Sequence, residues 1–459
     1  MKLSKYTTIQ ALDDENYLMV NALSGAVDVI DKENKMVIEQ IKSGNYTKNV
    51  EKNDLLDTLR ERGYLFTSES EEEQYIKRVY ELYLKVINTK AAKIVICPTF
   101  SCNLRCVYCF ESLDIRKSKE VMKKEDIDHI FRHIDTIVKD RQLEGYEIEL
   151  FGGEPLLPVT YEANRRVFEI ARERNKYVSI ITNGTHIKDY ENILSEYRDC
   201  ISQLQITIDG VREIHDKRRI KIDKTGTFKT ICEGINWLLA HKIKVAVRVN
   251  LDRDNIDTLA DLVKFFEESG WTDSKYFMTD VAPVVDHTSA NIDSSIMKEN
   301  EIIKRVQKMF PYTEENSYFN LRLFRVLNHI NNVIMGDEEM LTIPSFHYCE
   351  GNRMEFYVFA PDGKIYLCPE AVGYEAAIIG EYGEHINLYQ SKSDWLQRNI
   401  LTVEKCSKCE IAPFCGGGCP FASISVKHDI NDPVCDDAKE VFSDYIDSIK
   451  DTILEKCSD

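Results

Sequence analysis

The stretch "SCNLRCVYCF", residues 101–110, places three cysteines within eight positions. They are Cys102, Cys106 and Cys109, in the spacing C-x3-C-x2-C. Directly before them, the apolar run "KIVICP", residues 93–98, is typical of a short buried strand. Barrels built from alternating strands and helices carry their chemistry at the carboxyl ends of the strands. The stretch therefore predicts a barrel that begins near residue 91, with a site on its first loop.

Strand-like and helix-like segments alternate from residue 91 to about residue 310. The clearest helical pattern carries Ile127, Ile130, Phe131, Ile134 and Ile137 on one face. Alternation of this kind predicts the α/β class, with a parallel sheet closed into a partial (β/α)6 TIM-like barrel. The expected strands are "KIVICP", "YEIELF" (146–151), "VSIITN" (178–183), "QLQITID" (203–209), "IKVAVRVN" (243–250) and "KYFMTDVAP" (275–283).

Residues 1–66 have the pattern of a small separate domain. Alternating apolar residues in "NYLMVNALSGAVDVID", residues 16–31, predict a hairpin that turns near Ser24 and Gly25. Two short helical patterns follow, and Gly44 is placed to end the first of them. Strands with two short helices are winged-helix-like, so DNA binding is one interpretation. The segment holds nine Lys and Arg against eleven Asp and Glu. Because DNA readers carry a basic face, we favour peptide docking.

The remaining segments complete the expected organisation. The acidic run "TSESEEEQ" opens a linking helix over residues 67–90, and a bridging helical region covers residues 311–345. From residue 346 to residue 459 glycine, proline and cysteine are dense, and regular periodicity returns only in a C-terminal helix. A loop-rich segment with little core usually gains its stability from bound metal.

The composition narrows the class of protein. The 459 residues carry a net charge of −18 and include 14 cysteines. No run of about 18 apolar residues predicts a membrane span, and the N-terminus lacks the apolar core of a signal peptide. We therefore expect a cytoplasmic protein, in which thiols stay reduced and numerous cysteines indicate metal ligands. The negative charge argues against a nucleic-acid partner, and no membrane partner is expected.

The first three cysteines favour an iron–sulfur cluster over zinc. A structural zinc site needs a fourth protein ligand, and no cysteine or histidine follows closely enough. An iron–sulfur cluster takes the same thiolates and can leave one iron without a cysteine. The spacing, with Tyr108 before the last cysteine, resembles the signature of radical S-adenosylmethionine (SAM) enzymes. In that family the open iron binds SAM, which is cleaved to a 5′-deoxyadenosyl radical. An isolated zinc knuckle is the alternative.

Four further segments at strand ends resemble that family in the same chain order. They are "FGGEPLL" (151–157), "ITNGT" (181–185), "ITIDGVREIHDKRR" (206–219) and "VNLDRDN" (249–255). The resemblance implies that the first contacts the methionine amino group of SAM. Either of two adjacent arginines would pair with the SAM carboxylate. The expected cofactor-binding residues are Tyr108, Gly152, Gly153, Glu154, Asn183, Asp209, Arg218, Arg219 and Asn250.

Seven cysteines near the C-terminus resemble the SPASM extension of radical SAM enzymes, which carries auxiliary [4Fe–4S] clusters. A pair of zinc ribbons is the alternative. The resemblance implies three [4Fe–4S] clusters in all, with one auxiliary cluster on Cys406, Cys409, Cys415 and Cys435 and the other on Cys349, Cys368 and Cys419. Three thiolates leave one iron open, and a substrate cysteine is the ligand we favour there. The alternatives are a ligand among Cys97, Cys200, Cys232 and Cys457, or a buried thiol at each of those places.

A SPASM enzyme with a small strand-and-helix domain at its N-terminus resembles maturases of ribosomally made peptides. In them the N-terminal domain binds the leader of a precursor peptide, here by adding a strand to the hairpin sheet. Such enzymes need an electron donor such as ferredoxin or flavodoxin. The open iron favours thioether formation of the sactipeptide or ranthipeptide type. We single out Glu370 as the general base, with a surface carboxylate as the plainer interpretation, and expect His215 and His347 to be structural.

Three other functions stay open. Anaerobic sulfatase maturation is one, but those enzymes resemble only part of the pattern, because they place aspartate after the cysteine that matches Cys368 whereas this chain has Pro369 and then Glu370. Carbon–carbon cross-linking of peptides is the second, and it needs no substrate cysteine. The third is a non-enzymatic metal-binding protein, which would not cleave SAM.

Overall fold

The computed structural model describes residues 1–46, 53–88, 91–287, 295–310, 324–336, 343–435 and 437–456. Contacts within the chain divide it into two compact units. The terminal unit comprises Met1–Ile87, Phe324–Glu350 and Gln397–Asp459, and the barrel unit comprises Asn88–Leu323 and Gly351–Leu396. Most of the bridging region expected at 311–345, namely 311–323 and 337–342, lies outside the described residues.

The barrel unit contains the six parallel strands that the sequence predicts. Each strand pairs with the next in chain order, and the apolar residues of every strand are largely buried. This confirms the α/β class and the open, partial barrel. The strands are β6 (Ala91–Ile96), β7 (Gly145–Leu150), β8 (Val178–Thr182), β9 (Ile201–Thr207), β10 (Val245–Leu251) and β11 (Phe277–Pro283).

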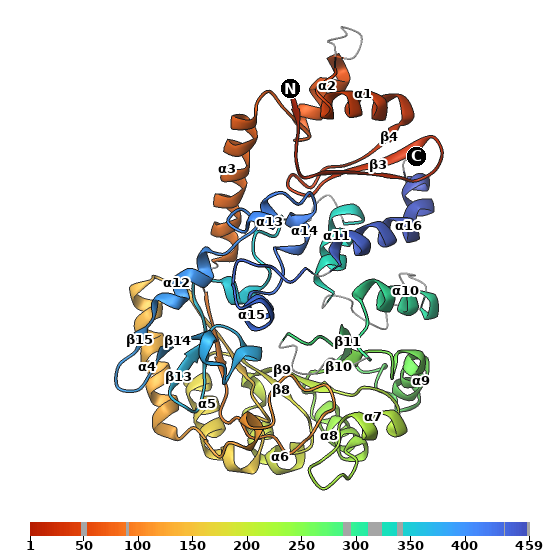
Figure 1. Ribbon diagram of the computed structural model, residues 1–459. Coiled ribbons are helices and arrows are strands. Elements are labelled where there is room, and N and C mark those ends of the chain that lie inside the picture. Colours follow the sequence, from red (N-terminus) through yellow and green to blue (C-terminus); the bar gives the residue numbers. More distant parts are fainter. Residues whose placement is uncertain are drawn as a thin grey trace. The chain divides into compact units, whose positions relative to one another are not determined.

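Helices cover the outer side of these strands (Figure 1). In α4 (Lys124–Asp140), Ile127, Ile130, Phe131 and Ile134 are buried as predicted, and Ile137 is half-buried at the end of the same face. The other helices of this unit are α5 (Tyr161–Glu173), α6 (Ile187–Glu196), α7 (Arg212–Arg218), α8 (Phe228–Ala240), α9 (Leu259–Glu268) and α10 (Glu299–Met309).

Four later strands extend the barrel sheet beyond β6. β12 (Phe356–Phe359) runs parallel to β6, with Phe356 opposite Lys93, and β13 (Lys364–Tyr366), β14 (Ile378–Glu381) and β15 (Asn387–Leu388) continue antiparallel. The sequence segment expected as one domain, 346–459, is therefore divided by the contacts of the structure. Its residues 351–396, which include most of α12 (Gln390–Gln397), group with the barrel because β12 pairs with β6.

The terminal unit begins with the predicted hairpin. β3 (Asn16–Asn21) pairs with β2 (Thr7–Ala11) and β4 (Val27–Asp31), and Gly25 takes a φ of 74° in the turn near Ser24. Gly44, with a φ of 73°, ends α1 (Lys32–Lys42) where the sequence predicts its end. α2 (Asn53–Glu61) follows, and β5 (Leu65–Phe66) pairs with β1 (Lys2–Leu3).

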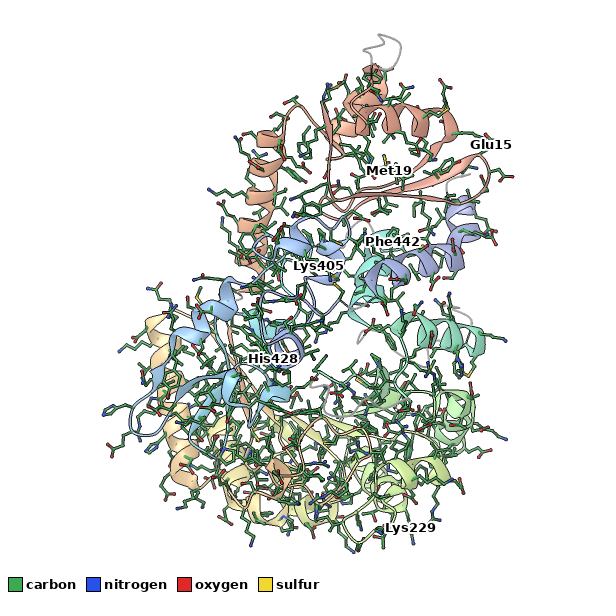
Figure 2. The ribbon with its side chains drawn as sticks, viewed as in Figure 1. Glu15, Met19, Lys229, Lys405, His428 and Phe442 are labelled. Carbon is green, nitrogen blue, oxygen red and sulfur yellow. The ribbon has the colours of Figure 1, made fainter. Side chains whose placement is uncertain are left out.

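A compact core holds these elements together. Met19 of β3 packs with Ile38 and Ile41 of α1 and with Leu56 and Leu59 of α2. Figure 2 shows Met19 between the sheet and α1. A second core joins α3 (Glu69–Ile87) to the later segments of this unit through residues such as Tyr83 and Phe346. Those segments contain α11 (Arg325–Ile334), α13 (Glu404–Ser407), α14 (Ala412–Cys415), α15 (Pro420–Ala422) and α16 (Ala438–Lys456).

Among the described helices, none is both long enough and apolar enough to cross a bilayer.

A histidine in the terminal unit generates a prediction about pH. Burial lowers the pKa of His329, on α11, from 6.5 to about 4. Below pH 6.5 the unfolded chain gains a proton at this ring that the folded chain gains only near pH 4. The stability that His329 contributes is thus full above about pH 6.5 and falls by on the order of 2–3 kcal/mol as the pH drops to 4. We expect His329→Gln to flatten the fall in thermal unfolding midpoint over that range. The exposed-site control His241→Gln should match wild type, and a His329→Gln curve parallel to wild type would contradict the prediction.

Candidate functional site

The loop that carries Cys102, Cys106 and Cys109 follows β6 and is held by a segment far along the chain. The backbone amide of Arg105 donates to the carbonyl of Ile220 at 2.7 Å, and that of Val107 donates to the carbonyl of Arg218 at 3.0 Å. The loop that carries the three cysteines, called the cluster loop, is therefore fixed against the end of α7 and the residues that follow it, where the two arginines expected to bind SAM lie.

The three thiols are partly enclosed, and burial raises the pKa of each, to about 12 for Cys109. Metal binds the thiolate form of cysteine. Because water solvates these enclosed sulfurs poorly, a bound cation has to stabilise their negative charge. The amide of Leu104 lies 3.4 Å from Cys102 Sγ and donates toward it, as backbone amides do to cluster sulfurs. Within the described residues no three His, Cys, Asp or Glu side chains converge on a single-ion position. Three thiols on one loop, with a backbone amide directed at one sulfur, fit an iron–sulfur cluster.

Gly152 and Gly153 pack tightly against the start of the same loop. Gly152 has a φ of 135°, and a Cβ there would lie 2.6 Å from Cys97 Sγ. A Cβ on Gly153 would lie 2.3 Å from the carbonyl oxygen of Phe100 and 2.4 Å from that of Ser101. The sequence predicts these glycines for close approach to a ligand. The structure gives them a further reason, since side chains would push the two loops apart.

Glu154 is fully buried at the end of β7. Its carboxylate accepts hydrogen bonds from Thr182 Oγ1 at 2.6 Å and from the amide of Asn183 at 2.7 Å. Burial raises the pKa of Glu154, and these hydrogen bonds oppose the rise. The backbone amide of Leu156 also donates to Glu154 Oε1 at 2.9 Å. All three hydrogen bonds come from neutral donors, so the buried carboxylate keeps a negative charge that fits a cationic ligand such as an ammonium group.

Asn183 reaches from the end of β8 to the cluster loop. Its Nδ2 donates to Asn103 Oδ1 at 2.8 Å and lies 4.0 Å from Cys102 Sγ. Asn103 in turn donates to Thr185 Oγ1 at 2.9 Å. Sequence reasoning missed Asn103, although its place within the cysteine motif was the available signal.

Tyr108, Asp209, Arg219 and Asn250 form one polar network at the ends of β9 and β10. The hydroxyl of Tyr108 donates to Asp209 Oδ2 and accepts from Arg219 at 2.8 Å. The side-chain Nδ2 of Asn250 donates to the Tyr108 hydroxyl at 3.3 Å, and the backbone amide of Asn250 donates to Asp209 Oδ1 at 3.1 Å. Four residues predicted separately are thus brought together by direct contacts.

Arg218 is paired within the chain. It donates to Asp252 Oδ1 at 2.7 Å and lies over the ring of Tyr108, 5.0 Å from its centroid. The Nε atoms of Arg218 and Arg219 are buried and make no hydrogen bond in the described part of the chain. Arg218 Nε already lies 3.7 Å from Asp209 Oδ2, whereas Arg219 keeps a donor of the kind that pairs with a carboxylate ligand. Sequence reasoning missed Asp252, which stands two residues after Asn250.

Glu370 lies in the turn Pro369–Ala371 and contacts His287, just beyond β11, with 2.5 Å between Glu370 Oε2 and His287 Nδ1. Burial lowers the pKa of Arg248, on β10, and Glu370 is the strongest of the acidic groups that oppose this. Arg248 also donates to Asn250 Oδ1 at 2.8 Å, which ties it to the Tyr108 network. Sequence reasoning missed His287, for which a loop position gives no signal, and Arg248, an arginine inside an apolar strand.

The later cysteines fall in both units. Cys406, Cys409, Cys415 and Cys435, expected to share a cluster, all lie in the terminal unit, as do Cys349 and Cys419, whereas Cys368 lies in the barrel unit. Backbone amides donate to two of these sulfurs, Gly417 to Cys415 at 3.4 Å and Ala422 to Cys419 at 3.5 Å. Such amides favour the thiolate form that binds metal. Both ligand sets remain predictions.

In the sequence "CGGGC", residues 415–419, the backbone between the two cysteines adopts a conformation that only glycine takes easily. Gly416, Gly417 and Gly418 have φ values of 70°, 90° and 73°. A Cβ on Gly416 would lie 2.3 Å from the carbonyl oxygen of His347, and one on Gly418 would lie 2.4 Å from that of Val434. Residues with side chains would strain or displace this loop.

The cysteines considered as extra ligands have other surroundings. Cys97 is buried and donates to the carbonyl of Thr99 at 3.3 Å, and Cys200 is also buried. Cys232 is half-buried on α8, and Cys457 lies outside the described residues. The two histidines expected to be structural are both buried, and the Nδ1 of His215 accepts from the amide of Asp209 at 3.3 Å. His215 thereby helps to place a member of the Tyr108 network.

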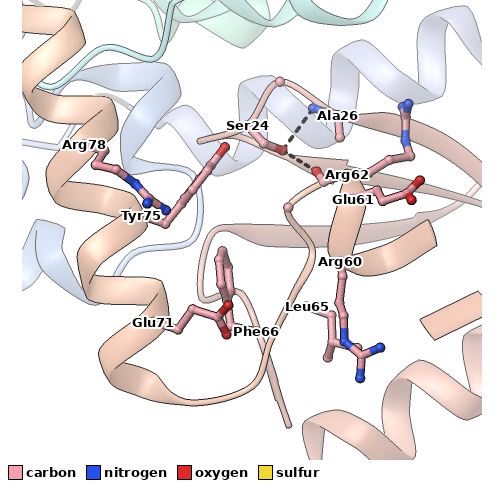
Figure 3. Close-up of a pocket in the computed structure, with 12 residues that line it drawn as sticks. Ser24, Ala26, Arg60, Glu61, Arg62, Leu65, Phe66, Glu71, Tyr75 and Arg78 are labelled. Atoms are coloured by element: carbon pink, nitrogen blue, oxygen red, sulfur yellow. Dashed lines mark hydrogen bonds between the residues drawn. The ribbon is translucent and has the colours of Figure 1, made fainter. Parts of the chain in front are cut away.

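A pocket of about 550 Å³ lies in the terminal unit, apart from all of these residues. Ser24 and Ala26 of the β3–β4 turn, the segment from Arg60 to Phe66, and Tyr75 and Arg78 of α3 line it (Figure 3). Its wall therefore combines the turn of the predicted hairpin with the linking helix.

Comparisons with known proteins identify a family match and two similar relatives. Residues 96–266 match the Radical SAM superfamily. The chain is 26% identical over 351 residues to the cysteine-type anaerobic sulfatase-maturating enzyme of Clostridium novyi, covering 72% of this chain and 88% of that protein. It is 22% identical over 452 residues to the radical SAM cyclopropyl synthase TigE of Paramaledivibacter caminithermalis, covering 91% and 89%.

Two solved structures share the fold. Native anSMEcpe with bound AdoMet has a TM-score of 0.62 at 18% identity, over 80% of this chain and 99% of that one. Streptococcus suis SuiB bound to the precursor peptide SuiA has a TM-score of 0.54 at 16% identity, over 95% and 99%. The likeness to SuiB extends over nearly the whole chain.

The contact of Gly153 with the cluster loop predicts the effect of one added methyl group. In Gly153→Ala the Cβ overlaps two backbone carbonyls, so the loop must move and SAM affinity should fall at least about tenfold, about 1.4 kcal/mol. Equilibrium dialysis with labelled SAM measures this. Gly383→Ala is the matched control, because a Cβ there meets nothing within 4 Å. Equal affinity in the two variants would contradict the packing argument.

Proposed function

We propose that the chain is a radical SAM peptide maturase that installs cysteine thioether cross-links in a ribosomally made precursor. The match of residues 96–266 to the Radical SAM superfamily and the similarity to two radical SAM maturases support the proposal. The observation that carries the proposal is the Glu370–His287 pair, which provides a proton acceptor two residues from Cys368. In the proposed ligand set, Cys368 is one of only three thiolates around an auxiliary cluster. A substrate thiol arriving as the fourth ligand would meet that acceptor.

The residues for the radical chemistry fit their proposed roles. Cys102, Cys106 and Cys109 would hold the first [4Fe–4S] cluster, and Glu154 and the two arginines would bind the charged ends of SAM. When bound, that cluster and SAM supply a 5′-deoxyadenosyl radical, which removes a hydrogen atom from carbon. The Tyr108 network would position the cofactor through contacts that it already makes within the protein.

The balance of the reaction assigns a role to the acid–base pair. Each thioether forms one carbon–sulfur bond and removes two hydrogens from the peptide. One leaves as an atom and becomes part of 5′-deoxyadenosine. The other leaves the thiol as a proton, which Glu370 and His287 would accept, and the auxiliary clusters, when bound, would supply the acceptor for the remaining electron. Arg248 would favour the ionised form of Glu370 until the proton arrives.

Leader capture would take place on the terminal unit. On β2, at one edge of its three-stranded sheet, the side chain of Gln10 donates to the carbonyl of Ser443 and to Asp447 of α16, so α16 lies against this strand. At the other edge β4 pairs only with β3 among the described residues. A leader strand added to β4 would run toward the pocket of Figure 3, where Arg78 and Tyr75 could receive a polar side chain. An electron donor such as ferredoxin or flavodoxin completes the proposed set of partners.

Two other reactions are favoured by particular relatives. The similarity to TigE favours bond formation to carbon without sulfur, and the similarity to the Clostridium novyi enzyme favours sulfatase maturation. Neither requires a substrate thiol to end as a thioether. The fate of the substrate cysteine therefore separates the three reactions.

The test uses reconstituted enzyme, SAM, dithionite and synthetic peptides made from any small cysteine-rich reading frame found beside the gene. We expect 5′-deoxyadenosine, a peptide that has lost two hydrogens per cross-link, and cysteines that no longer react with iodoacetamide. Loss of two hydrogens with the cysteines still alkylated would show carbon–carbon bond formation instead. Conversion of a cysteine to an aldehyde would show formylglycine formation, and no 5′-deoxyadenosine would contradict all three.

Glu370→Gln tests the proposed proton acceptor separately. General-base loss typically costs about 10²–10⁴-fold in rate, so cross-linking should fall by about that factor. SAM cleavage should persist, because Glu370 is not among the proposed SAM contacts. Mass spectrometry of the peptide and chromatography of 5′-deoxyadenosine measure the two rates. Glu375→Gln, at an exposed carboxylate five residues away, should match wild type. Unchanged cross-linking in Glu370→Gln would remove this residue from the mechanism.

A further inference from the structure

Arg398 is a buried arginine that no step above uses. It follows α12 and is only 2% exposed. Its guanidinium donates to the carbonyls of Ile430 at 2.6 Å, Gly418 at 3.1 Å and Gly417 at 2.7 Å. It also contacts Ser423 Oγ at 3.4 Å. All four acceptors are neutral, and two of them belong to the three-glycine loop between Cys415 and Cys419.

The buried positive charge of Arg398 has no aspartate or glutamate partner to neutralise it in the described part of the chain. In the described part of the chain, Arg398 makes no ion pair with an aspartate or glutamate. A guanidinium keeps its charge in proteins, and burying an unpaired charge is costly. Hydrogen bonds to carbonyls offset part of that cost, but they do not neutralise the charge.

Four cysteines lie close enough to Arg398 to interact with its charge instead. Burial lowers the pKa of Arg398, and the groups that oppose this are Cys406, Cys419, Cys349 and Cys415. The Cβ position of Gly417 lies 3.8 Å from Arg398 Nη1 and 3.6 Å from Cys406 Sγ, so the guanidinium and that sulfur face the same point of the loop. Within the proposed ligand sets, two of these cysteines belong to each auxiliary cluster. All of them lie with Arg398 in the terminal unit.

We propose that Arg398 is a positioning residue that fixes the Cys415–Cys419 loop and supplies one buried positive charge to both auxiliary clusters, raising their reduction potentials. The inference rests on the proposed function, because it takes these cysteines as cluster ligands. A nearby cation favours the more negative, reduced state of a cluster, and solvent screens a buried cation little. Higher potentials favour acceptance of the electron that each cross-link releases.

The experiment is an anaerobic redox titration followed by electron paramagnetic resonance. It uses the full chain with Cys102, Cys106 and Cys109 changed to Ala, so that only the auxiliary clusters report. In this background we compare Arg398→Gln, Arg398→Lys and Lys408→Gln. Lys408 is exposed and paired with Glu404 at 2.6 Å, so its variant removes one charge from the same region without removing a buried one. Iron content is measured for every sample.

Arg398→Gln should lower the equilibrium constant for reduction at least about tenfold, about 59 mV for one electron. Arg398→Lys should keep more than half of the wild-type effect, and Lys408→Gln should change the constant less than about twofold. Unchanged potentials in an iron-replete Arg398→Gln protein would overturn the proposal.

If Arg398→Gln loses iron, its potentials cannot be compared with wild type, and Arg398→Lys becomes the variant that tests the proposal. Full iron at near wild-type potential in Arg398→Lys would support the role of the charge. Iron loss in the lysine variant as well would reduce Arg398 to a structural residue and overturn the electrostatic claim. If the parent protein gives no auxiliary-cluster signal at all, the proposed function fails, and the inference fails with it. That result is distinct from intact signals whose potentials do not move.

Discussion

The cysteines of this chain must be charged to bind metal, yet they lie where charge is costly. Burial raises the pKa of the thiols in the first motif. Other groups of the protein lie where they stabilise sulfur anions. The amides of Leu104, Gly417 and Ala422 donate toward three sulfurs. Arg398 adds a buried cation near the later set. Tight glycine loops, remote hydrogen bonds and unusual buried ions in this structure follow from that one constraint.

In the barrel unit the same constraint links segments that are far apart in the sequence. The cluster loop after β6 is held by the backbone after α7 and packs against the glycine pair after β7. Asn183 and Asn250 close the site from β8 and β10. Because parallel strands bring their carboxyl ends to one edge, five short motifs spread between residues 101 and 255 come together at one site. The chemistry thus depends on the order of the strands as much as on any single side chain.

Local patterns predicted much of this fold. All six barrel strands, the turn at Gly25 and the helix end at Gly44 follow from apolar periodicity and from the backbone freedom of glycine. Pairings between remote segments did not: the joining of β12 to β6 depends on which edge of the sheet is free. Loop contacts such as His287 with Glu370, and buried ions such as Arg398, carry no periodic signal. The motif residues were identified by family resemblance, whereas their mutual hydrogen bonds required coordinates.

The central claim is that the cysteines of this chain hold three [4Fe–4S] clusters, one of them on the first motif. Iron and sulfide analysis after anaerobic reconstitution tests it most directly, with wild type beside the variant that has Cys102, Cys106 and Cys109 changed to Ala. The account predicts about twelve irons in wild type and about eight in the variant, with sulfide falling in parallel. Zinc in place of iron, or an iron content that the three substitutions leave unchanged, would contradict it.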